Sequence, residues 1–119
     1  MATLTVQNIA KAGLTPVYGA VALSDTFLNV GDERNFLHVK NGSGASINVT
    51  VVAQKTQVKV PGVGQLTIAN QVVAVPAGQE RIIGPFSEAF NDANGMVVVN
   101  YSAITTVTAA ALRLAPDSL

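Results

Sequence analysis

The chain has 119 residues, of which seven are basic and seven acidic, so its formal net charge at pH 7 is zero. It contains no cysteine, which excludes disulfides, thiolate metal sites and a cysteine nucleophile. Charged residues make up 12% of the chain, about half the usual share, so we expect no basic surface for nucleic acid or anionic membranes.

The composition predicts an all-β protein. The chain has 18 Val, 6 Ile and 10 Thr, whose branched side chains favour strands. Clusters of Gly and Asn separate these runs and supply turns. The length fits a single domain over residues 1–119, and no linker, internal repeat or ten-residue amphipathic helix is visible.

The first predicted strand lies in the N-terminal segment, where Leu4 and Val6 alternate with polar residues. Two roles are open for residues 1–7. They either form an arm that adds to a neighbouring protein's sheet, with Leu4 and Val6 as contact residues, or complete a sheet of this domain. A further extended stretch is expected at residues 15–23, where Pro16 indicates an edge or the start of a strand.

The next predicted strands cover residues 27–30 and 35–40. Residues 41–46 (NGSGAS) predict a hairpin turn. The clearest alternation of the chain follows, because the odd-numbered residues of the segment 47–53 are apolar and face one side of a strand.

Residues 54–70 predict a projecting hairpin. Its arms turn through the sequence PGVG, in which Pro61 presets the backbone and Gly62 permits the positive φ of a type II turn. Val63 and Leu66 lie near the expected tip and are the candidate contact residues of this segment.

The C-terminal part predicts short strands and turns in close succession. Strands are expected at 71–75, 80–83, 96–102 and 105–114, turns at 76–78 and 92–95, and one helical turn at 86–90. About eight to ten short strands at this spacing predict an antiparallel β-sandwich of jelly-roll-like type or a small barrel.

The sequence lacks a motif for catalysis or metal binding. The sole histidine, His38, lies on a predicted strand and cannot alone supply the imidazoles of a catalytic zinc site. Asp32 and Glu33 are adjacent in sequence, which places them on opposite faces of a strand. Residues 91–95 (NDANG) bring oxygen ligands beside a glycine, but turn chemistry accounts for them. We therefore expect no enzyme activity, no cofactor and no metal.

The distribution of charge is the strongest functional signal. Between Asn41 and Gln79 the only charges are Lys55 and Lys59. A free monomer with zero net charge and few surface charges tends to associate. We interpret this as a surface that other protein covers in the working state; a surface rich in Thr, Asn, Gln and Ser is the alternative. The N-terminus lacks a secretory pattern, and the apolar runs are too short to cross a membrane.

Several segments carry a resemblance to a known family. They are residues 35–51 (NFLHVKNGSGASINVTV), 75–86 (VPAGQERIIGPF), 90–102 (FNDANGMVVVNYS) and 104–114 (ITTVTAAALRL), together with the start, 3–18 (TLTVQNIAKAGLTPVY). Over nearly its whole length the chain resembles small structural proteins of tailed bacteriophages, the head decoration or cement proteins. Residues 54–70 are the least similar part.

The resemblance implies a virion protein on the capsid exterior, made in the host cytoplasm. Its implied partners are the major capsid protein and further copies of itself, a trimer being one option. A tail or head–tail connector protein is the first alternative, because the quoted segments contain strand and turn patterns, which indicate a fold family more than a particular function. A soluble carbohydrate-binding β-sandwich is the second, against which the chain offers only two Tyr, four Phe and no Trp.

Overall fold

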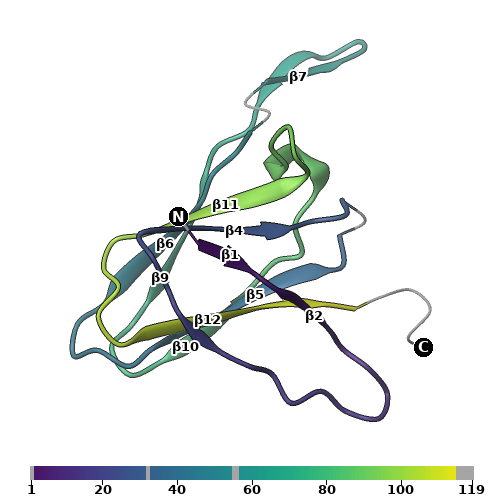
Figure 1. Cartoon of the computed structure of the whole chain (residues 1–119). Coiled ribbons are helices and arrows are strands. Elements are labelled where there is room, and N and C mark those ends of the chain that lie inside the picture. The colour runs from purple at the N-terminus through teal and green to yellow at the C-terminus, as the bar shows by residue number, and fades with distance from the viewer. Residues whose placement is uncertain (1, 32, 55–56, 115–119) are drawn as a thin grey trace.

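The computed structural model describes residues 2–31, 33–54 and 57–114. Two five-stranded β-sheets pack together (Figure 1). Sheet A has the strand order β1-β4-β11-β6-β9, and sheet B has the order β10-β5-β12-β2, with β3 also paired to β12. The described strands are β1 (Ala2–Leu4), β2 (Val6–Asn8), β3 (Gly19–Ala20), β4 (Ser24–Leu28), β5 (Asn35–Asn41), β6 (Ile47–Val51), β7 (Gln57–Val60), β8 (Gly64–Thr67), β9 (Gln71–Val75), β10 (Glu80–Ile83), β11 (Met96–Tyr101) and β12 (Val107–Arg113).

The β-sandwich prediction is confirmed, and the sheets do not close into a barrel. The sheets are mixed, however, and not purely antiparallel. β1 runs parallel to β4 in sheet A, and β2 runs parallel to β12 in sheet B. Neither pair is joined by a tight turn, so the antiparallel direction that a hairpin imposes does not apply to them. One short N-terminal segment therefore contributes a strand to each sheet.

The core fills the space between the inner faces of the two sheets. Alternation in β6 buries Ile47, Val49 and Val51 and leaves Asn48 exposed, as the sequence predicts. The buried apolar cluster comprises Val21, Phe27, Leu37, Val39, Ile47, Val49, Val51, Val75, Ile83, Phe86, Val97, Val99, Tyr101, Val107, Ala109 and Ala111. Valine dominates this set, and each fully buried valine contributes about 1.5–3 kcal/mol relative to exposure.

The turn at residues 41–46 is not a hairpin, contrary to the prediction, because β5 lies in sheet B and β6 in sheet A. The chain crosses between the sheets there, and the buried Asn41 side chain holds the crossing. Its Nδ2 donates to the carbonyl oxygens of Ala45 at 2.8 Å and Val75 at 3.0 Å, while Oδ1 accepts from the N–H and hydroxyl of Ser43. Gly and Asn encode a reversal of the chain but not which sheet the next strand joins.

The hairpin predicted for residues 54–70 forms as β7 and β8, which pair antiparallel and stand apart from both sheets. It is inserted between β6 and β9, which are neighbours in sheet A. Figure 1 shows it projecting from the sandwich. Gly62 adopts φ 81°, the positive value that the expected turn requires.

The segment before β4 differs from the prediction. Of residues 15–23, only Gly19 and Ala20 form a strand, and β4 ends at Leu28 where a strand to residue 30 was expected. Val17 instead bonds to a side chain, because its N–H donates to Gln7 Oε1 and its carbonyl accepts from Gln7 Nε2, both at 2.8 Å. The Gln7 side-chain amide thus makes with the Val17 backbone the two hydrogen bonds that a neighbouring strand would otherwise make.

The remaining strands and turns form where predicted, but β11 ends at Tyr101 and β12 covers only Val107–Arg113 of the predicted 105–114. β9 and β10 have the predicted bounds, and η1 (Glu88–Phe90) is the predicted helical turn. The turn at 92–95 closes with a hydrogen bond from the Gly95 N–H to the Asp92 carbonyl at 3.1 Å. The turn after β9 likewise carries the chain from one sheet to the other, from sheet A to sheet B.

We expect Asn41→Ala to lower the free energy of unfolding by about 2–3 kcal/mol, because it removes several hydrogen bonds and leaves buried carbonyls unpaired. Urea unfolding of the purified chain measures this. Asn48→Ala, at an exposed position of β6, is the matched control and changes stability by about 0.5 kcal/mol or less. Equal losses in the two variants would contradict this role for Asn41.

Candidate interaction surface

Leu4 and Val6, the predicted contact residues of the N-terminal segment, lie within the domain's own fold. Leu4 pairs with Phe27 in sheet A, and Val6 pairs with Ala111 in sheet B. Both side chains are partly buried and pack against the core cluster. This placement agrees with the second role considered for residues 1–7, completion of the domain's own sheets. A contact of this strand with a neighbouring protein stays a prediction.

Val63 lies in the turn between β7 and β8 and is 70% exposed. Leu66 belongs to β8, where it pairs with Val58, and its side chain lies outside the described residues. The hairpin therefore presents at least one large apolar side chain to solvent at a point away from the core.

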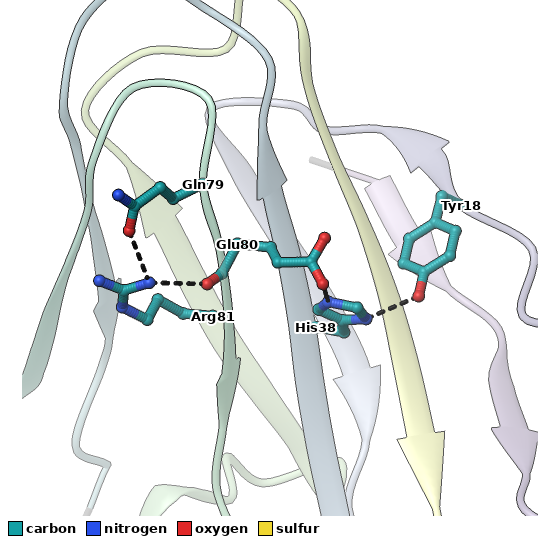
Figure 2. Close-up of polar contacts among 5 residues, drawn as sticks. All are labelled: Tyr18, His38, Gln79, Glu80 and Arg81. Carbon is teal, nitrogen blue, oxygen red and sulfur yellow. Dashed lines mark hydrogen bonds and ion pairs between the residues drawn. The ribbon is translucent and has the colours of Figure 1, made fainter.

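His38 lies on β5 with its ring on the outer side of sheet B, between Tyr18 and Glu80 (Figure 2). Its Nδ1 lies 2.6 Å from the Tyr18 hydroxyl, and its Nε2 lies 3.3 Å from Glu80 Oε1. The second contact has an ion-pair distance without the geometry of a hydrogen bond. The Lys40 ammonium sits 4.0 Å from the centre of the Tyr18 ring.

These contacts give His38 a positioning role in the fold. It holds Tyr18, which precedes β3, against sheet B, and the Lys40 ammonium adds a cation–π contact to the same ring. Beside it, Arg81 Nη1 donates to Gln79 Oε1 at 3.2 Å and to the Glu80 carbonyl at 2.8 Å. Within the described residues, no group of three His, Asp or Glu side chains is placed to hold a metal ion.

The polar side chains of the NDANG segment (residues 91–95) form hydrogen bonds within the fold. Asp92 Oδ1 accepts from the N–H groups of Asn94 and Met96 at 2.8 and 3.1 Å. The Asn91 side chain exchanges hydrogen bonds with Asn29, donating to its carbonyl at 2.9 Å and accepting from its Nδ2 at 2.7 Å. Turn and loop packing therefore account for these polar groups, as the sequence suggests.

Asp25 and Tyr101 are buried on the inner side of sheet A. Burial raises the pKa of the Tyr101 phenol well above its ordinary value of 10.0, and the negative charge of Asp25 raises it further. The Asp25 carboxylate accepts the N–H of Ala22 at 3.2 and 3.3 Å. The Tyr101 hydroxyl has no hydrogen-bond partner among the described residues. The phenol therefore stays protonated inside the sandwich.

The outer face of sheet A carries no charge, because none of its five strands has a charged side chain at an outward position. Strand alternation and register assign the outward positions. They are Thr3, Ser24, Thr26, Leu28, Asn48, Thr50, Val72, Ala74, Met96, Val98 and Asn100. Leu28 is 53% exposed and Val72 is 55% exposed. We call this surface the uncharged face.

Sequence reasoning did not name the uncharged face, although its signal is present in the chain. No charged residue occurs from residue 93 to residue 112, and only two occur between Asn41 and Gln79. These two stretches supply β6, β9 and β11, which lie side by side in sheet A. Their adjacency, which makes one continuous surface, depends on the sheet topology.

The described residues include no helix with the length and apolar character needed to span a membrane. Comparisons of the chain with protein-family models, curated proteins and solved structures gave no match.

We expect Tyr101→Phe to leave the free energy of unfolding at pH 7 unchanged or raised by up to about 1 kcal/mol, because it removes a buried hydroxyl that has no partner. The native phenol keeps its proton above pH 10 while the unfolded one releases it, so wild-type stability falls as the pH rises through that range. The variant should lose less stability between about pH 9 and pH 11. Urea unfolding at both pH values measures this.

Tyr18→Phe is the matched control for this prediction. Its hydroxyl bonds to His38, so its removal should cost about 1 kcal/mol at pH 7. A larger loss at pH 7 for Tyr101→Phe than for Tyr18→Phe would contradict the assignment.

Proposed function

We propose that this chain is a head decoration, or cement, protein that binds the outer surface of a phage capsid and stabilises it. Its partners are the major capsid protein and further copies of itself, and its place is the exterior of the virion, after synthesis in the host cytoplasm. The uncharged face of sheet A is the observation that carries the proposal. The resemblance of most of the chain to such proteins supports it.

The physical argument concerns the cost of removing water from a surface. An unpaired charge that is buried in an interface is expensive, whereas hydroxyl, amide and aliphatic groups lose water at little cost. The uncharged face offers only groups of the second kind, including the exposed Leu28 and Val72. It can therefore be covered by another protein surface without a matching pattern of charges on the partner.

The β7–β8 hairpin supplies a second contact in this proposal. It projects away from the sandwich (Figure 1). Its proposed role is to contact a capsid subunit next to the one that the uncharged face covers. Val63 and Leu66 are its proposed contact residues. Leu4 contributes by fixing β1 next to β4, at the edge of the uncharged face, and Val6 by fixing the following strand, β2, in sheet B.

Stabilisation of the capsid follows from linkage. A protein that binds only the assembled shell favours that state by mass action, and many copies multiply modest individual contacts. A contact of standard size, about 800 Å² per partner, is within reach of a chain whose principal extents, projecting hairpin included, are 47 × 35 × 22 Å. No covalent step is required.

We expect the purified chain to co-sediment with mature shells of the phage that encodes it, in hundreds of copies per particle. Leu28→Lys places a charge on the uncharged face and should weaken attachment about tenfold or more, equivalent to about 1.4 kcal/mol. Quantitative co-sedimentation over a range of concentrations measures both the affinity and the copy number.

Ile82→Lys is the matched control, because Ile82 is 65% exposed on β10 of sheet B. It should attach as well as the wild type. Equal weakening by both substitutions would refute the uncharged face as the docking surface. Attachment of only a ring-sized number of copies would replace the proposal with a tail or connector role.

A further inference from the structure

The strands at the edges of the two sheets differ in how well they are protected from pairing with another chain. Three of the strands at the rim are very short, namely β1 and β2 with three residues each and β3 with two. β10 has four residues, of which Glu80 and Arg81 are charged. Short length and charge are the usual means by which a protein keeps its edge strands from pairing with other chains. β9 has neither protection, since its five residues, QVVAV, include no charge.

The outer edge of β9 is also open. Its inner edge pairs with β6 over all five residues, and β9 is the last strand of sheet A. Among the described residues, no hydrogen bond other than those of the β6 ladder reaches the backbone of residues 71–74. Gln71, Val72 and Ala74 are exposed. One side of this strand therefore presents free backbone donors and acceptors next to apolar side chains.

A cleft of about 360 Å³ lies beside this edge, between β9 and β10. Val73, Phe86 and Phe90 line it, and Arg81 lies at its rim. Val73 and Phe90 are only partly buried, so the core is incompletely covered on this side of the sandwich. A strand added along β9 would place its alternate side chains over this cleft.

We propose that β9 pairs antiparallel with β9 of a second copy of this chain, about a two-fold axis near Val73. Sheet A then continues through the dimer as one sheet. Val73 lies opposite Val73 of the partner and covers part of the partner's cleft, and Val72 lies opposite Ala74 on the outer side. This inference deepens the self-association in the proposed function but does not need the capsid.

A second copy fits this edge for two physical reasons. An uncharged strand meets its own image without repulsion between like charges. The net charge of zero adds no long-range repulsion between copies.

The first test is the mass of the wild-type chain in solution, without capsids, by sedimentation velocity and light scattering up to about 1 mM. A reversible monomer–dimer equilibrium is expected. A monomer throughout this range overturns the proposal, and so does a trimer, because a closed three-fold ring cannot be built from β9–β9 pairs.

Complementary charges then test the register. Val72 and Ala74 point away from the core, so a double Lys variant (V72K with A74K) and a double Glu variant (V72E with A74E) are designed to keep the fold, and circular dichroism checks this. Each alone places like charges directly opposite each other, and its dimer dissociation constant should rise at least about tenfold. An equimolar mixture should form a heterodimer. Failure of the mixture to associate overturns the pairing.

Leu23→Lys is the matched control, because Leu23 is 63% exposed and precedes β4, on the far side of sheet A from β9. It should dimerise like the wild type, and loss of its dimer overturns the assignment to β9. Val72 and Ala74 also belong to the uncharged face, so weaker capsid attachment by the double Lys variant is expected from the proposed function and is not used to judge the β9 pairing. The pairing is judged by the mass of the chain in solution and the proposed function by co-sedimentation with shells, so the two proposals fail independently.

Discussion

Contact between the valine-rich inner faces of the two sheets is the interaction on which the rest of this structure depends. It fixes, through the two-residue period of each strand, which side chains point inward and which point outward. Once Val49, Val99 and Phe27 are committed to the core, their neighbours in sequence must lie on the outer face of sheet A. The uncharged face is therefore a consequence of core packing together with the lack of charge at the outward positions of β4, β6, β9 and β11.

The sequence predicts the strands well where alternation is strict and poorly where side chains replace backbone pairing. β6, β9 and β10 follow directly from alternating or short apolar runs bounded by turns. Residues 15–23 contain the same residue types, yet most of them form no strand, and the backbone of Val17 bonds instead to the Gln7 amide, ten residues away. A single long-range side-chain contact of that kind leaves no periodic signal in the sequence.

The local sequence predicts where a strand lies along the chain, but it does not predict which of the two sheets the strand joins. The turns after β5 and β9 carry ordinary turn residues, but each takes the chain to the opposite sheet. The crossing after β5 is held by the Asn41 amide, which bonds to buried carbonyls, one of them on Val75 of β9. That partner is distant in sequence. The residues 41–46 alone therefore predict a hairpin, and the prediction is wrong because β5 and β6 belong to different sheets. The candidate surface shares this dependence, since its strands become neighbours only through the topology.

Several polar side chains of this chain are buried and several large aliphatic side chains are exposed, the reverse of the usual arrangement. Asp25, Asn29, Asn35 and Asn41 are buried, while Leu28, Val63, Val72 and Ile82 are exposed. The buried asparagines are explained by hydrogen bonds that fix loops and crossings, such as Asn35 donating to the Leu28 carbonyl and accepting from Arg113. No comparable interaction within the described chain explains the exposed aliphatic groups. Two of them, Leu28 and Val72, lie on a face without charge, and surfaces of that kind lower their free energy when another protein covers them.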